Sequence, residues 1–189
     1  MSSRVTLRTY LHGEESTRPF ELADGVVREP PAPTWPHQIV VGRIHVKLAD
    51  HVQRYELGRV VASPIDVVLK EQPPLVVQPD VVFVTHDRLN ICRERVWGPP
   101  DLVVEVLSGA TRRHDTTVKV EWYRMYGVRE CWLVDPVSLD VTVLGVEVDD
   151  EPCVFRDRDL VRSTVLPRIR LRPHTVFEST GVKRIRRRV

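Results

Sequence analysis

Acidic residues interrupt two runs that otherwise favour β-strands. The run DLVVEVL carries Glu105 between valines, and PDVVFVT begins with Asp80 directly after a proline. A carboxylate is almost never fully buried without a partner, so Glu105 needs a cation or a donor beside it. Side chains alternate along a strand, which places four residues on one face: Asp101, Val103, Glu105 and Leu107. If the two strands are neighbours, Asp80 and Glu105 converge.

Two converging carboxylates repel and raise each other's pKa unless a cation lies between them. Their hard oxygen atoms suit Mg²⁺ or Mn²⁺, which bind one or two protein carboxylates and leave the remaining positions to water and phosphate. Lys119 follows Glu105 by 14 residues, one turn into a predicted helix, and can reach back over the carboxyl end of the sheet. The pattern therefore predicts a metal site at Asp80 and Glu105 with Lys119 beside it.

Each of these residues also has a purely structural interpretation. Asp80 fits a turn residue at the entry of a strand. Glu105 fits a buried ion pair with Lys119 or with an arginine, and Lys119 alone is typical of a solvated helix lysine. His37, at the start of a helix, is more typical of a capping or packing residue than of a ligand. Asp66, in SPIDVVL, fits an edge-strand residue better than a third catalytic acid.

Two helices and several strands must position these side chains. Apolar and aromatic residues at steps of three and four predict an amphipathic helix that ends at Gly58 (His37, Val41, Ile44, Leu48, Val52 and Tyr55). Before it, FELADGVVRE predicts two short strands around a turn at Asp24 and Gly25, and PPAPTWP predicts an extended loop stiffened by proline.

A second helix is predicted from Thr111 or Asp115 to Tyr126, with Gly127 as its stop. Its inner stripe is either Val118, Trp122 and Met125 or Lys119, Tyr123 and Tyr126; the first choice lets Lys119 border a polar cleft. Strand-like runs surround it (GRVVASPIDVVL, DVVFVT, DLVVEVLS, CWLVDP and VTVLGVEV). The strand–helix–strand unit implies parallel neighbours joined by a crossover, so we expect an α/β fold with a mixed sheet flanked by helices.

The bulk composition is that of a folded domain. With 189 residues, 42% hydrophobic and 29% charged, we expect a single domain over residues 1–189, with a core at about 20–177. No apolar stretch is long enough to span a membrane, and MSSRVTLRTYLHGEE lacks the apolar core of a signal peptide, so we expect a cytoplasmic protein. Three cysteines without close pairing (Cys92, Cys131 and Cys153) predict free, mostly buried thiols rather than disulfides or a zinc site.

The positive charge is concentrated in a tail at residues 182–189. The net charge is +2, and the last eight residues, VKRIRRRV, hold five cations and no anion, so the rest of the chain carries −3. This excludes a uniformly basic nucleic-acid-binding protein. A short basic tail can still add phosphate contacts that do not depend on sequence, but a solvated terminus is the simpler explanation.

The order of these motifs resembles the bacterial Uma-two family, which is grouped with restriction-endonuclease-like proteins of the PD-(D/E)xK superfamily. The resemblance rests on ELADG, the proline-rich loop, HQIVVGRIHVKL, SPIDVVL, VQPDVVFV, PPDLVVEVLS, a D-x-x-x-K run, YGVRECWLVDP and LPRIRL, from about Phe20 to Phe177. It implies a restriction-endonuclease-like core with Asp80 and Glu105 as the two motif acids. Glu21, assigned to the site, and His37 match further family positions.

The resemblance implies a Mg²⁺- or Mn²⁺-dependent endonuclease that hydrolyses phosphodiester bonds of DNA. The standard motif would place lysine at Leu107, so here Lys119 would be a lysine that has moved to the following helix. The alternatives are an inactive nucleic-acid-binding or partner-binding module of the same fold and a protein in which Glu105 and Lys119 form a structural ion pair. With one active site per chain, double-strand cleavage would favour a two-fold homodimer.

Overall fold

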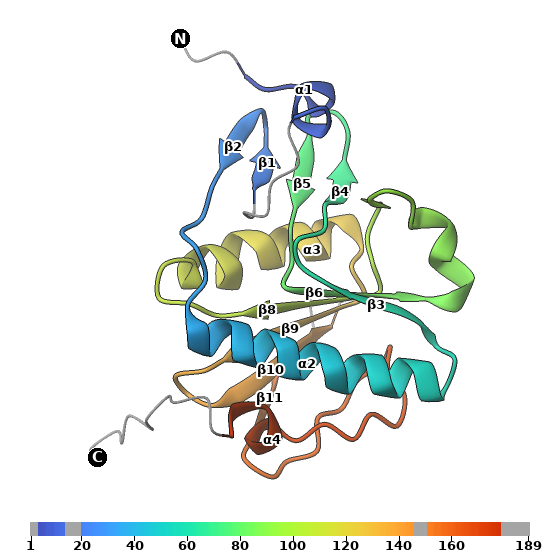
Figure 1. The fold of residues 1–189 in the computed structure, drawn as a ribbon, viewed down its shortest axis with the longest axis vertical. Helices are drawn as coiled ribbons and strands as arrows, with labels where there is room; N and C mark the ends of the chain where they lie inside the picture. Colours follow the sequence, from blue (N-terminus) through green and yellow to red (C-terminus); the bar gives the residue numbers. More distant parts are fainter. Residues whose placement is uncertain (1–3, 14–19, 146–150, 179–189) are drawn as a thin grey trace.

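The computed structural model describes residues 4–13, 20–145 and 151–178, so the basic tail lies outside the described residues. The expected α/β class is confirmed, and the strands are divided between two mixed sheets (Figure 1). The six-stranded sheet has the order β11-β10-β9-β8-β6-β3 (Cys153–Arg156, Asp140–Gly145, Glu130–Asp135, Leu102–Val106, Val81–Thr85 and Gly58–Ala62). The five-stranded sheet has the order β2-β1-β5-β4-β7 (Val26–Arg28, Glu21–Ala23, Leu75–Val77, Val67–Lys70 and Val96–Trp97).

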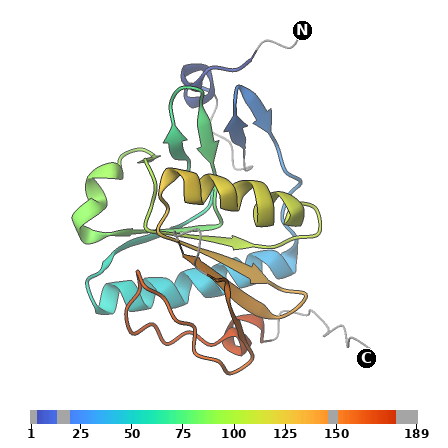
Figure 2. The ribbon, with the colours of Figure 1, turned by 180° about the vertical axis from the view of Figure 1, so that it is seen from behind.

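Helical segments connect and cover the sheets. In chain order they are α1 (Leu7–Leu11), α2 (Trp35–Arg54), the 3₁₀-helix η1 (His86–Ile91), the π-helix η2 (His114–Lys119), α3 (Val120–Tyr126) and α4 (Pro173–Phe177). Helices α2 and α3 lie on opposite faces of the six-stranded sheet in both views (Figures 1 and 2). None of the helices in the described ranges combines the length and apolar character needed to cross a membrane.

Strand β8 is the element on which the candidate site depends. It pairs antiparallel with β6 and parallel with β9, and η2 and α3 form the crossover between β8 and β9. Both the adjacency of the two acidic strands and the parallel strand–helix–strand unit are therefore confirmed. The last pair of β6 and β8 is Val81 with Val104, so Asp80 and Glu105 lie one step further, at the same end of the two strands.

The side chains of β8 alternate between two cores, as the sequence predicts. One face belongs to the core cluster that includes α2 (Leu102, Val104 and Val106 with Val40, Ile44 and Leu48). The other face belongs to the cluster under α3, which also contains residues of the five-stranded sheet (Val103 and Leu107 with Val120, Tyr123, Val67 and Val77). Glu105 lies on the second face, so its carboxylate points to the region where the two sheets and α3 meet.

The first predicted helix is present as α2, and its period places Val41, Ile44 and Leu48 in the core. It ends at Arg54, four residues before the predicted stop, and Gly58 is instead the first residue of β3. Gly58 has a φ of +152°, and a Cβ atom there would lie 2.0 Å from the carbonyl oxygen of Val84. Only glycine allows this approach, which brings β3 against the end of β6.

Two details of the predicted elements are wrong. The run GRVVASPIDVVL is not one strand, because it breaks at residues 63–66 and its halves join different sheets as β3 and β4. The second helix ends at Gly127 with a left-handed φ of +83°, as expected, but its first half is a π-helix. Of the two inner stripes that the spacing allowed, the one with Lys119 and Tyr123 is buried, whereas Val118 and Met125 are exposed.

The cysteines are free, as predicted, but only one of them is buried. Cys131 lies in the core beneath α3, Cys92 is half-buried, and Cys153 is exposed. The expectation of mostly buried thiols is therefore wrong for Cys153, because β11 is an edge strand of the six-stranded sheet and leaves its side chains open to solvent.

Candidate active site

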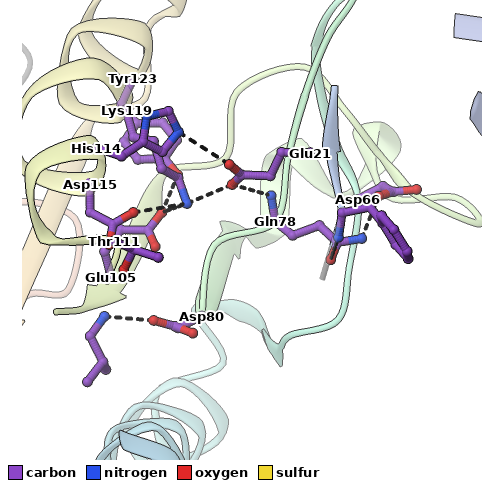
Figure 3. Close-up of polar contacts among 12 residues, drawn as sticks. Glu21, Asp66, Gln78, Asp80, Glu105, Thr111, His114, Asp115, Lys119 and Tyr123 are labelled. Atoms are coloured by element: carbon purple, nitrogen blue, oxygen red, sulfur yellow. Dashed lines mark hydrogen bonds and ion pairs between the residues drawn. The ribbon is translucent and has the colours of Figure 1, made fainter. Parts of the chain in front are cut away.

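The four residues assigned to the site line one cavity of about 570 Å³. Glu21 comes from β1, Asp80 directly precedes β6, Glu105 lies on β8, and Lys119 ends η2. Both sheets and the crossover helix thus contribute to the same space (Figure 3). Leu107, where the standard motif would carry lysine, instead packs in the core under α3.

Lys119 is the centre of the site. Its Nζ atom lies 2.7 Å from Oε1 of Glu105, 2.8 Å from Oε1 of Glu21 and 3.9 Å from Oδ1 of Asp115. Its side chain is 4% exposed, so these contacts are shielded from water. The hydroxyl of Tyr123 also donates a hydrogen bond to Oε1 of Glu105. The mid-strand glutamate is therefore buried with two donors on one oxygen atom.

Glu21 is held from the opposite side of the cavity. Its Oε1 accepts a hydrogen bond of 3.4 Å from the backbone N–H of Gln78, and Nε2 of His114 lies 3.4 Å from its Oε2. The side chain of Gln78 accepts from the N–H of Phe20 and donates to Asp66 at 2.8 Å. Asp66 thus acts through Gln78 and does not line the cavity, so it is a structural residue, but it precedes the inner strand β4 and not an edge strand.

Asp80 makes a separate set of contacts at the end of the sheet. Its Oδ2 accepts a hydrogen bond of 2.7 Å from the backbone N–H of Val106, and Nε2 of His37 lies 3.4 Å from the same atom. The N-cap position of α2 is Thr34, so His37 does not cap the helix. Burial lowers the pKa of His37, whereas the hydrogen bond to Asp80 and the charge of Asp80 raise it. The raising effects together are larger, so the pKa of His37 lies above its usual value.

The pKa values of the buried groups around Lys119 depend on the fact that one ammonium group lies among several carboxyl groups. Burial raises the pKa of Glu105 to about 8, which the charge of Lys119 opposes and the neighbouring acids reinforce. Burial also opposes ionisation of Glu21, but Lys119 and the donors around it bring its pKa down to about 2. The pKa of Lys119 is raised, because the acids outweigh its burial. Lys119 is therefore charged and pairs with ionised Glu21, while Glu105 retains a proton at neutral pH.

Sequence reasoning missed four residues of the site: Asp115, His114, Tyr123 and Gln78. Asp115 was noted only as the first residue of the D-x-x-x-K run, although its spacing of four residues from Lys119 places both side chains on one side of a helix. Tyr123 follows Lys119 by four residues and could have been found in the same way. No comparable local signal marks His114 or Gln78, because their contacts with Glu21 join segments far apart in the chain.

The chemistry of the donor set fits a hard divalent cation. Asp80 and Glu105 supply carboxylate oxygens to one cavity, and Mg²⁺ commonly binds through one or two carboxylates and otherwise water. Within the described ranges, no group of three or more His, Cys, Asp and Glu side chains is arranged to hold a metal ion. Lys119 already contacts Glu105. A cation can bind there only if the ammonium group moves away from Glu105 and the Glu105 carboxyl loses its proton.

Comparisons with known proteins agree with this architecture. Residues 7–172 match the Uma2 family, whose description is "Putative restriction endonuclease". A crystal structure of "a putative nuclease belonging to DUF820 from Anabaena variabilis ATCC 29413" has the same fold, with a TM-score of 0.77 and 19% sequence identity. The alignment covers 92% of this chain and 97% of that one. A search of curated proteins found no match.

Proposed function

Since the chain belongs to the Uma2 family of restriction-endonuclease-like proteins, we propose that it is a Mg²⁺-dependent DNA endonuclease acting at this cavity. The observation that carries the proposal is that both sheets and the crossover helix bring four side chains to one cavity (Asp80, Glu105, Lys119 and Glu21). A purely structural role for these groups would not require an open cavity beside them. The cytoplasmic location and the two-fold homodimer stay predictions from the sequence.

Asp80 and Glu105, with a backbone carbonyl near Val106, would hold Mg²⁺ in this proposal. When bound, the ion supplies Lewis-acid stabilisation of the charge that develops on the phosphate oxygens. Mn²⁺ has the same preference for oxygen ligands and should substitute. Val106 is suited to this position because its N–H already fixes Asp80 against the end of β8.

Lys119 would position the attacking water and stabilise negative charge in the transition state. The acids around it raise its pKa, so the ammonium donates hydrogen bonds rather than removing a proton from water. Glu21 would hold the lysine in place, because its carboxylate lies 2.8 Å from Nζ on the side opposite Glu105. Glu21 is therefore a positioning residue for Lys119.

Cleavage of plasmid DNA tests the proposal directly. We expect the parent protein to cleave with Mg²⁺ or Mn²⁺ and to lose activity in EDTA. Asp80→Asn and Lys119→Met should each lower the rate roughly 100-fold or more, the scale expected when a group that stabilises the charge of the transition state is lost. Asp50→Asn, at an exposed aspartate of α2, is the matched control and should cleave at the parent rate. Equal rates for Lys119→Met and the parent would remove Lys119 from the mechanism.

The close contact between Lys119 and Glu105 also favours a second candidate, a structural ion pair without catalysis. Removing one partner of a buried pair costs about 3–5 kcal/mol, so Lys119→Met should lower the melting temperature of the metal-free protein in either case. If the site binds metal, Mg²⁺ replaces the missing cation and should restore much of the loss. A purely structural pair predicts the same loss with and without Mg²⁺, and no cleavage by the parent.

A further inference from the structure

Trp35 is the first residue of helix α2 and directly follows a segment that lines the cavity, and 78% of its surface is exposed. Residues 28–34 line the cavity without a break, and the lining continues with His37, Gln38 and Val41 of α2. Tryptophan is highly buried on average and is enriched at binding surfaces, because its large apolar ring gains much from contact. Trp35 does not itself line the cavity, but it directly follows Thr34, which does, so its exposed indole points to a ligand that extends beyond the cavity.

The segment before Trp35 presents the ring rigidly. Prolines at positions 30, 31 and 33 restrict the backbone before the helix, and Pro36 follows Trp35 inside the first turn. A ring on a stiff segment loses little conformational freedom when it binds. This part of the chain therefore has the properties of a preorganised contact surface rather than of a loose loop.

Gly42 extends the same surface along the helix. Residues three or four apart lie on one side of a helix, so Trp35, Gln38 and Gly42 form one row, called here the α2 strip. Gly42 is exposed, and apart from the adjacent backbone of its own helix, a Cβ atom built there meets no described atom within 4 Å. Glycine inside a helix costs about 0.5–1 kcal/mol relative to alanine, yet no packing neighbour in the described part of the chain requires it. Its bare backbone leaves room for close approach by a ligand.

We propose that the α2 strip binds the nucleic-acid strand beside the cavity, with Trp35 stacked on a base that lacks a duplex neighbour. The inference rests on the proposed nuclease function and specifies its substrate class. Inside a duplex both faces of each base are covered, so an exposed ring can stack only on a terminal, unpaired or flipped base. Arg28, in the same cavity wall, supplies a cation for the backbone phosphates. Single strands, flaps and frayed ends are thus preferred over continuous duplex.

Fluorescence anisotropy with a labelled single-stranded oligothymidine and a labelled long duplex, both in Ca²⁺ buffer, tests this inference. Trp35→Ala should raise the dissociation constant for oligothymidine roughly 5- to 150-fold, the equivalent of about 1–3 kcal/mol for one stacked base. Trp35→Phe should recover most of the affinity, because a phenyl ring also stacks. Duplex binding should change far less. Met125→Ala is the matched control, since Met125 is 72% exposed on α3 and does not line the cavity.

Gly42→Gln provides a second variant that is not expected to unfold the protein. Glutamine is a better helix former than glycine, so the melting temperature should rise slightly, while the new side chain on the α2 strip should weaken oligothymidine binding. A structural role for Gly42 predicts the reverse, a lower melting temperature with unchanged binding.

Several results would overturn the inference. Unchanged oligothymidine affinity in Trp35→Ala, or equal losses for oligothymidine and duplex, would do so. If sedimentation showed that Trp35→Ala only converts a dimer into a monomer, a second copy of the chain would cover Trp35 instead. If the parent cleaves DNA and Trp35→Ala cleaves and binds as the parent does, the proposed function stands and only this inference is overturned. A parent that binds no oligonucleotide overturns both.

Discussion

Glu105 can remain inside the protein because two donors, Lys119 and Tyr123, meet its carboxylate. The same burial makes its ionised form unfavourable, and the other acids of the cavity add to this effect. A single ammonium cannot neutralise Glu21, Glu105 and Asp115 together, so one proton stays in the cluster. At the residue scale the site therefore holds a lysine charge and a carboxyl proton, both of which a divalent cation could displace.

The raised pKa of Glu105 predicts how stability depends on pH without metal. The folded protein holds the Glu105 proton up to about pH 8, whereas the unfolded chain releases it near 4.5. The free energy of unfolding should therefore fall as pH rises through this window, by up to about 1.4 kcal/mol per pH unit. Glu105→Gln lacks this proton, so its stability should fall less steeply. Urea denaturation in EDTA at pH 5–8 compares them, and identical slopes would contradict the prediction.

At the scale of elements, the five-stranded sheet brings Glu21 to Lys119. Strand β1 pairs with β5, and Gln78 directly after β5 holds both Glu21 and Phe20. Asp66 orients the Gln78 amide from the start of β4 and also pairs with Arg95. The position of Glu21 in the cavity thus depends on the pairing of β1 with β5 and on the hydrogen bonds that Gln78 makes with Glu21 and Phe20.

Gln78→Ala tests this dependence. The change removes the acceptor of the Phe20 N–H and one donor to Asp66, so we expect a destabilisation of about 1–3 kcal/mol. Because β1 is then less restrained, the amide hydrogen of Phe20 should exchange faster with solvent. Cleavage of DNA should also fall, although the variant still carries Glu21. Gln53→Ala, at an exposed position of α2, is the control. Unchanged exchange at Phe20 would show that Gln78 does not hold the strand.

At the scale of the whole molecule, the cavity lies where the two sheets and the crossover helix meet (Figure 3). The six-stranded sheet contributes Asp80 and Glu105, the five-stranded sheet contributes Glu21, and η2 contributes Lys119. The site is therefore complete only in the folded chain. A ligand bound there stabilises the folded state as a whole by mass action.

Divalent metal should accordingly raise the melting temperature. At a concentration 100 times the dissociation constant, Mg²⁺ should add about 2.7 kcal/mol to the free energy of unfolding. Asp80→Asn should abolish the increase, because it removes one of the two proposed carboxylate ligands. Asp50→Asn should respond as the parent does. A full response to Mg²⁺ in Asp80→Asn would place the metal elsewhere.

The sequence by itself determined the elements with strong local patterns and the acids on them. The run of β-forming residues in DLVVEVL located β8, the alternation of side chains along a strand put Glu105 on one face, and the apolar stripe from Val41 to Val52 identified most of α2. The glycine at 127 ended α3 where it was expected, since its left-handed φ is disfavoured for other residues. The order of motifs also led to the family.

Only the tertiary structure decided how these pieces meet. The split of GRVVASPIDVVL between two sheets depends on long-range pairing, for which the local run carries no signal. The spacing left two inner stripes open for the second helix, and only packing against the sheets selected the one that carries Lys119 and Tyr123. The contacts of Gln78 and His114 with Glu21 join distant segments. Local sequence determines which face a side chain takes, but packing between elements determines what it touches.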